Sequence, residues 1–232
     1  MKMPDYHKLP NELQCDEVKY YYNILKTKTT GLVAKRIFDI FVALIFIVIL
    51  SLPMLVIAII IKCTSKGPVI YKQVRVTTFG KRFRIWKFRT MRTDADAKGE
   101  LLTVSGDNRI TRIGHILRKF RLDELPQIFH VLSGKMSIVG TRPEVPKFTD
   151  VYTNDMLATL LLPAGVTSLA SIRFKDEAKL LSNAKDADKV YIEKILPEKM
   201  KYNLEYIEKF SFMGDIKLMF KTVAEVFSSR GE

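Results

Sequence analysis

The segment at residues 118–127 (RKFRLDELPQ) places two adjacent carboxylates, Asp123 and Glu124, among cations. Carboxylates in a basic setting suit phosphate chemistry, because an acid can attack phosphorus or hold a metal ion while cations bind phosphate oxygens. The same letters also fit an ordinary helix start, with Asp123 as N-cap and Pro126 in the first turn. This segment alone does not decide between the two interpretations.

The neighbourhood of a helix start would affect how these two acids behave. Free N–H groups and the helix dipole stabilise an anion there, so we expect Asp123 to stay ionised at neutral pH. An ionised carboxylate favours a nucleophile over a general acid. Glu124 beside it has the hard oxygen ligands that Mg²⁺ prefers.

Other segments carry candidate chemistry. In residues 87–91 (KFRTM) cations alternate with apolar residues, which fits either a strand with one wet face or a phosphate clamp. In residues 140–144 (GTRPE), Gly140 permits unusual backbone angles and Pro143 restricts the loop that presents Arg142. The D-x-D pattern at residues 94–96 resembles a nucleotide-sugar site of metal-dependent glycosyltransferases, but no hydrophobic strand precedes it.

Several common catalytic signatures are absent from the sequence. It contains no G-x-x-x-x-G-K-[ST], no G-x-G-x-x-G and no G-x-S-x-G, which argues against a P-loop NTPase, a dinucleotide-binding fold and a serine hydrolase. The two cysteines and three histidines show no metal-ligand spacing.

A long apolar run precedes these segments and must position them. Residues 37–61 would form a helix of about 37 Å, longer than the ~30 Å hydrocarbon core of a bilayer. Ser51 and Pro53 lie near its middle, where proline removes a helical hydrogen bond and predicts a break. Asp39 is costly in lipid unless it meets a cation such as Arg36 or lies at the headgroup level.

Lysine and arginine flank both ends of this run, so the positive-inside rule places both ends in the cytoplasm. A re-entrant helix-break-helix hairpin satisfies that rule, whereas a plain spanning helix with a tolerated proline is the alternative. The net charge of +13 with 47% hydrophobic residues suits anionic membrane lipid or phosphorylated ligands. No nucleic-acid motif is present, so we expect no nucleic-acid partner.

The predicted fold class is mostly α with minor β, in which the re-entrant membrane helix precedes a small interfacial α/β catalytic domain. Short strands are expected between residues 67 and 91. Further helices are expected at 110–120, from Asp123 to Gly134, and around 176–183, 188–209 and 214–228. The expected division is a polar extension at 1–33 (with a short amphipathic helix), a membrane hairpin at 34–63 and a cytoplasmic interfacial domain at 64–232.

Six segments in this order resemble the bacterial sugar transferases called monotopic phosphoglycosyl transferases, also termed polyprenyl-phosphate sugar-1-phosphate transferases. The resemblance runs from about Lys35 to the C-terminus. The segments are 35–39 (KRIFD), the Ser51/Pro53 break, 67–75 (GPVIYKQVR), 87–91, 122–127 (LDELPQ) and 140–144.

This resemblance implies that Asp123 is the catalytic nucleophile and that Glu124 is both catalytic and a Mg²⁺ ligand. Lys87, Arg118 and Arg142 match the family's basic, substrate-binding residues. The implied reaction moves a sugar-1-phosphate from a UDP-sugar to a polyprenol phosphate, expected to be undecaprenyl phosphate, through a phosphosugar bound to the aspartate, and it releases UMP. That reaction starts exopolysaccharide, capsule or other glycoconjugate synthesis at the cytoplasmic face of the bacterial inner membrane.

One departure concerns the sugar. Many relatives continue from Pro-Gly-Ile-Thr-Gly to a Trp and an Asn-Gly-Arg element, whereas residues 163–174 here are PAGVTSLASIRF, which leaves sugar specificity open. The oligomeric state is open too, with a homodimer as one alternative. The alternative functions are a lipid-acceptor glycosyltransferase that releases UDP, and a membrane scaffold without catalysis.

Overall fold

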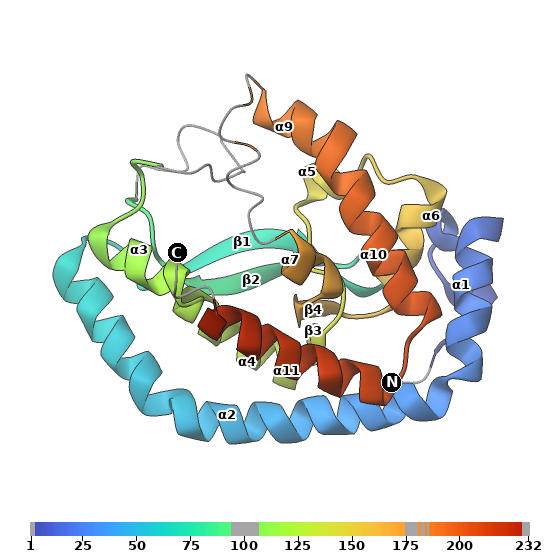
Figure 1. The fold of residues 1–232 in the computed structure, drawn as a ribbon, viewed down its shortest axis with the longest axis horizontal. Helices are drawn as coiled ribbons and strands as arrows, with labels where there is room; N and C mark the ends of the chain where they lie inside the picture. The colour runs from blue at the N-terminus through green and yellow to red at the C-terminus, as the bar shows by residue number, and fades with distance from the viewer. Residues whose placement is uncertain (1–2, 94–106, 175–180, 182–183, 185, 229–232) are drawn as a thin grey trace.

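The computed structural model describes residues 3–93, 107–174, 181, 184 and 186–228. It is mostly helical, with two small sheets in the interior of the domain and one long helix along its edge (Figure 1). The helices are α1 (Asp16–Thr27), α2 (Thr29–Thr64), α3 (Arg112–Lys119), α4 (Ile128–Leu132), α5 (Pro146–Thr149), α6 (Asn154–Leu157), α7 (Leu169–Arg173), α9 (Ala187–Val190), α10 (Leu196–Glu208) and α11 (Phe212–Ser228). The strands are β1 (Ile70–Val76), β2 (Arg82–Phe88), β3 (Met136–Val139) and β4 (Ala164–Thr167).

The apolar run forms α2, a helix of 36 residues that is longer than the predicted segment. At 1.5 Å per residue it is about 54 Å long. Among the described residues it is the one helix apolar and long enough to cross a membrane, and most of its apolar side chains are exposed. An exposed apolar surface of this size is typical of a protein–protein or membrane interaction site.

The helix does not break at Ser51 and Pro53 as predicted, because every residue of α2 is helical. The Ser51 hydroxyl donates to the Val48 carbonyl at 2.7 Å within the helix. Figure 1 shows that α2 curves around the domain, which lies on the concave side of the helix.

Both ends of α2 contact the same domain. Near its start, Leu32 belongs to a core cluster with Ile207 and Phe210 from the C-terminal part of the chain. Near its end, Ile61 packs with Phe88 and Leu117, from β2 and α3. The helix is therefore attached to one folded unit at two points.

Buried polar contacts fix the first half of α2. Lys35 donates to Asp215 Oδ2 at 2.6 Å and to the Val139 carbonyl at 2.8 Å. Asp39 accepts from Ser137 Oγ at 2.7 Å and from the Ile138 N–H at 3.2 Å. Asp39 is thus paired inside the protein, and neither Arg36 nor a lipid headgroup is needed to explain it.

Arg36 instead serves another element. It donates to the carbonyls of Val131 and Leu132 at 2.7 and 2.9 Å, at the end of α4. Cations stabilise the carbonyl end of a helix, so Arg36 fixes α2 against α4.

The N-terminal residues are part of the core. The predicted amphipathic helix is α1, and Val18, Tyr22 and Leu25 of its apolar stripe are buried. Leu9 and Leu13 join the same cluster, which includes residues 158–162. The segment that the sequence predicted to be a polar extension therefore packs on the domain that follows α2.

Two short sheets carry much of the site. β1 and β2 form an antiparallel hairpin in the register Ile70↔Phe88 to Val76↔Arg82, which confirms the predicted strands. β3 and β4 pair in parallel, and neither strand was predicted from the sequence.

The later helices confirm the helices expected at 188–209 and 214–228. In the first of these ranges, α9 and α10 join through a π turn at Tyr191–Ile195. The expected helix at 176–183 lies almost wholly outside the described residues.

The predicted helix from Asp123 to Gly134 is wrong in its first half. A 3₁₀ helix, η5 (Leu122–Gln127), precedes the short α4, and the residue before η5 is Arg121. Asp123 is therefore inside η5 and is not an N-cap. In α4, Ile128 and Val131 point inward, whereas Phe129 is 38% exposed.

Candidate active site

Glu124 is the most heavily bonded acid of the predicted pair. Lys87 Nζ donates to its Oε1 at 2.9 Å, and both terminal nitrogens of Arg142 contact the same carboxylate. Lys87 comes from β2, Glu124 from η5 and Arg142 from the loop after β3, so three elements distant in sequence meet here. Three of the five predicted site residues are thus joined by direct ion pairs.

Asp123 differs from its neighbour. It is 7% exposed, and among the described residues no hydrogen-bond donor contacts its carboxylate. The charges of Lys87, Arg118 and Arg142 nevertheless act on it. An unbonded carboxylate in a cationic site keeps its lone pairs available for an electrophile.

The pKa values of the two acids move in opposite directions. Burial raises the pKa of Asp123, the adjacent Glu124 charge adds to that effect, and Lys87 opposes it. Burial also acts on Glu124, but the charges of Arg142 and Lys87 outweigh it and hold the pKa of Glu124 well below its usual value. From a predicted helix start, we expected Asp123 to be the acid that stays ionised. In the structure it is Glu124 whose pKa is lowered, and its ion pairs with Lys87 and Arg142 are the cause.

Arg118 approaches from α3. Its Nε donates to Thr90 Oγ1 at 2.9 Å, so a residue of the 87–91 segment holds it. Thr111 caps the start of α3 by accepting the Gly114 N–H, which fixes the helix that carries Arg118. Burial lowers the pKa of the Arg118 guanidinium, and the Asp123 charge counteracts this.

The 87–91 segment is divided between two tasks. Lys87 points to Glu124, whereas Arg89 donates to the Ser65 carbonyl and hydroxyl at 2.8 and 2.7 Å. Ser65 is the C-cap of α2, so Arg89 binds the end of that helix and not the acid pair. The segment is therefore not a phosphate clamp as a whole.

The loop that presents Arg142 is held from both sides. Arg75 Nη1 donates to the Pro143 carbonyl at 3.0 Å. Glu144 is buried, and it accepts hydrogen bonds from Tyr191 and Lys199 at 2.6 and 3.2 Å. This buried group ties the Arg142 loop to the π turn and to α10.

Gly140 has a different role from the one expected. Its φ is not positive, so unusual backbone angles are not the reason for a glycine here. A Cβ on Gly140 would lie 2.6 Å from the Pro163 carbonyl oxygen, and one on Gly165 would lie 2.3 Å from the Gly140 nitrogen. The two glycines allow β3 and β4 to approach each other just before Arg142.

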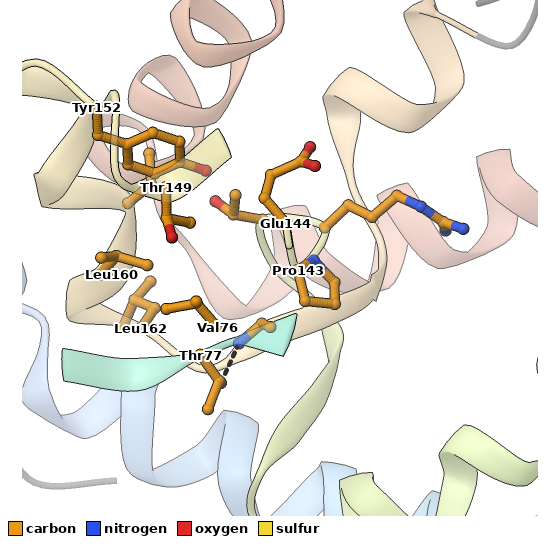
Figure 2. Close-up of a pocket in the computed structure, with 12 residues that line it drawn as sticks. Val76, Thr77, Pro143, Glu144, Thr149, Tyr152, Leu160 and Leu162 are labelled. Carbon is orange, nitrogen blue, oxygen red and sulfur yellow. Dashed lines mark hydrogen bonds between the residues drawn. The ribbon is translucent and has the colours of Figure 1, made fainter. Parts of the chain in front are cut away.

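A small cavity lies behind this loop. Figure 2 shows Pro143 and Glu144 on one side of it and Thr149, Tyr152 and Leu160 on another. Its volume of about 10 Å³ is enough for roughly one water molecule. A cavity of this size cannot hold a nucleotide, and neither Asp123 nor Glu124 lines it.

The remaining predicted residues lie elsewhere. Ser51 and Pro53 are in the exposed middle of α2, and the D-x-D motif at 94–96 lies outside the described residues. Neither the support that Glu144 gives nor the position of Arg121 beside the acids was predicted from the sequence. Two signals were available: Glu144 closes the GTRPE motif, and Arg121 lies two residues before Asp123.

Comparison with known proteins defines the class to which this fold and site belong. The model of the bacterial sugar transferase family matches residues 30–229, and the chain belongs to that family. It is 36% identical over 200 residues to the UDP-N-acetylgalactosamine-undecaprenyl-phosphate N-acetylgalactosaminephosphotransferase of Aeromonas hydrophila, covering 85% of this chain and 44% of the relative.

Two other relatives are informative. The UDP-glucose:undecaprenyl-phosphate glucose-1-phosphate transferase of Klebsiella pneumoniae is 36% identical over 204 residues, covering 86% of this chain and 41% of the relative. The exopolysaccharide production protein PSS of Rhizobium leguminosarum bv. phaseoli is 37% identical over 205 residues, covering 83% and 94%. The chain thus spans less than half the length of the first two relatives and nearly all of the third.

Proposed function

We propose that this protein transfers a sugar-1-phosphate from a UDP-sugar to a polyprenol phosphate, with undecaprenyl phosphate as the carrier. The names of the Aeromonas and Klebsiella relatives contain this carrier and a UDP-sugar. No particular sugar is proposed, because those equally similar relatives are named for different sugars. The product would start a polysaccharide, in line with the name of the Rhizobium relative.

The observation that carries the mechanism is the contrast between the two acids. An Asp123 oxygen attacks the β-phosphorus of the donor, an aspartyl–phosphorus bond forms, and the phosphoanhydride bond to UMP breaks. An oxygen of the carrier phosphate then attacks the same phosphorus, and the aspartate leaves as a free carboxylate. Asp123 suits this role because it accepts no hydrogen bond from the described residues.

The other site residues deal with charge. A phosphoryl transfer mainly needs positioning and neutralisation of the oxygens around phosphorus. Lys87 and Arg142 are held close by Glu124, and Arg118 is oriented by Thr90, so three basic side chains border Asp123. We assign them to the donor and carrier phosphates.

We also propose Mg²⁺ as cofactor. The described residues contain no cluster of three or more His, Cys, Asp or Glu side chains, so a cage made by the protein alone is not expected. Mg²⁺ in phosphoryl-transfer sites is typically held by one or two carboxylates plus substrate oxygens, which Glu124 and Asp123 match. Arg142 contacts Glu124 Oε2 at 3.3 Å, and that oxygen keeps a second lone pair for a metal. When bound, the ion would neutralise the donor diphosphate.

We propose further that α2 enters one leaflet and returns, on the cytoplasmic face of the bacterial inner membrane. Support comes from the attachment of both helix ends to one domain, which a helix with its ends on opposite sides of a bilayer could not keep. Single cysteines near Lys28 and Lys66 should both react only with a reagent on the cytoplasmic side. Reaction of either one from outside would establish a spanning helix.

The mechanism is tested by the nucleotide product and by protein mass. With UDP-sugar alone, wild type should release UMP and gain the mass of a phosphosugar, and Asp123→Asn should do neither while still binding donor. Release of UDP would point to a conventional glycosyltransferase. Normal turnover by Asp123→Asn, or product formation without any protein adduct, would refute the covalent mechanism.

A further inference from the structure

Arg121 has an unusual backbone for its residue type. Its φ is +52°, and Phe79 is the other non-glycine residue in the described part of the chain with positive φ. Arg121 follows Phe120, the C-cap of α3, at a position that glycine or asparagine normally occupies. An arginine there stores backbone strain, and such strain persists where the side chain or the local geometry is needed.

The backbone of Arg121 links α3 to the acids. Its N–H donates to the Arg118 carbonyl at 3.1 Å, and its own carbonyl accepts the Glu124 N–H at 3.3 Å. Arg121 is thereby fixed as the residue before η5, two positions ahead of Asp123. Its side chain starts from a defined place beside the site.

The side chain is available for a ligand. It is exposed, and no hydrogen bond or ion pair joins it to a described residue. By contrast, Lys87 and Arg142 are bonded to Glu124, and Arg118 to Thr90. The Arg121 carbonyl accepts the Glu124 N–H, so the Arg121 side chain leaves the backbone next to the acid pair.

The balance of charge leaves a place for an anion. Lys87 and Arg142 form ion pairs with Glu124, and Arg118 and Arg121 lie five and two residues before Asp123. These four cations face two carboxylates, which leaves a surplus of two positive charges. Arg121 is the member of this set that can bind a new anion without breaking a contact seen among the described residues. A guanidinium binds phosphate oxygens in a two-pronged geometry that an ammonium cannot copy.

We propose that Arg121 binds a phosphate group of a substrate at the entrance to Asp123, as an additional substrate-binding residue. The inference rests on the proposed transferase function, and it extends the predicted set of Lys87, Arg118 and Arg142. The phosphate belongs either to the donor diphosphate or to the carrier lipid. α3, which ends next to Arg121, packs on α2 through Leu117, so both the aqueous and the lipid substrate have a route to it.

Two variants separate binding from folding. Arg121→Gln removes the charge, and Arg121→Asn does so with a residue that tolerates the left-handed conformation. We expect Arg121→Asn to melt at or above the wild-type temperature, because the strained arginine backbone is relieved. The control is Lys81→Gln, which removes one exposed charge at the β1–β2 turn.

The kinetic test has two arms. The first varies UDP-sugar without lipid and follows the burst of one UMP per enzyme, whose half-saturating donor concentration serves as KM. The second varies polyprenol phosphate at saturating donor. A lost contact between a charged donor and phosphate should raise KM by about 10- to 100-fold in one arm, which identifies the phosphate. The same KM should also depend less steeply on salt, a change that a purely structural role would not cause.

The outcomes are distinct. If KM in both arms stays within twofold of wild type for both variants, Arg121 does not bind substrate phosphate and the inference is wrong. If wild type itself releases no UMP, the proposed function fails. In that case calorimetry with UDP and with a short polyprenol phosphate still tests the site, because Arg121→Gln should weaken the binding of one of them.

Discussion

Gly165→Ala should damage both the stability and the activity of this protein, although it adds a single methyl group. The new Cβ would lie 2.3 Å from both the nitrogen and the oxygen of Gly140, where an ordinary contact needs at least 3.4 Å. β3 and β4 must therefore separate by about 1 Å, the difference between these distances. Overpacking of this kind costs about 1–3 kcal/mol.

The activity loss follows from the position of Arg142. The Gly165 N–H donates to the Thr141 carbonyl at 2.8 Å, and Thr141 directly precedes Arg142. A shift of about 1 Å in a catalytic constellation reduces a rate by roughly 100-fold. We expect a fall of this order in the initial rate of UMP release, together with a lower melting temperature in detergent.

Gly31→Ala is the matched control. It makes the same change within α2, where the Cβ would meet the Phe210 ring at an ordinary 3.4 Å. Alanine favours a helix over glycine by about 1 kcal/mol, so this variant should keep its activity and be no less stable. If Gly165→Ala behaves like Gly31→Ala, the close approach of β3 and β4 does not position Arg142.

Four other variants test buried ionisable groups. Lys35→Met breaks the buried pair with Asp215 and should lower the free energy of unfolding in urea by about 3–5 kcal/mol. The double variant Lys35→Met/Asp215→Leu should recover part of this loss. Equal stability of wild type, the single variant and the double variant would contradict the expectation. Burial, aided by Lys135, lowers the pKa of His130 from 6.5 to about 4, so the stability that neutral His130 supplies is full above pH 6.5 and declines toward pH 4. His130→Gln should flatten that decline in thermal melts across the same range, and an unchanged slope would exclude the assignment. The lowered pKa of Glu124 supplies stability above its unfolded pKa of 4.5, so the difference in melting temperature between wild type and Glu124→Gln should shrink as the pH falls below 4.5.

The elements predicted correctly are those whose sequence pattern lies within one short stretch of the chain. Alternating residues predicted the β1–β2 hairpin, and apolar spacing predicted α1 and α10, because each of these two helices buries one regular face. Apolar spacing also predicted α11. The motif order also anticipated that Lys87, Glu124 and Arg142 meet.

Long-range pairing was beyond sequence reasoning. β3 and β4 are four residues each and pair in parallel across a connection of more than 20 residues, so no short window reveals them. The 3₁₀ form of η5 arises because Arg121 turns the chain into the left-handed region, and the letters LDELP carry no sign of that turn. The partners of Lys35 and Asp39 are equally distant along the chain, and the expectation of a lipid or Arg36 contact for Asp39 failed for that reason.

The contacts of α2 have a consequence for biosynthesis. During translation α2 leaves the ribosome long before its polar partners exist, since Ser137 follows Asp39 by 98 residues and Asp215 follows Lys35 by 180. The nascent helix must therefore reach the bilayer while Lys35 and Asp39 still lack their hydrogen-bonding partners. Its contacts with the folded domain are complete only after α11 has been synthesised. A ribosome-stalled chain that ends before α11 should thus be bound to membranes yet more sensitive to protease than the finished protein.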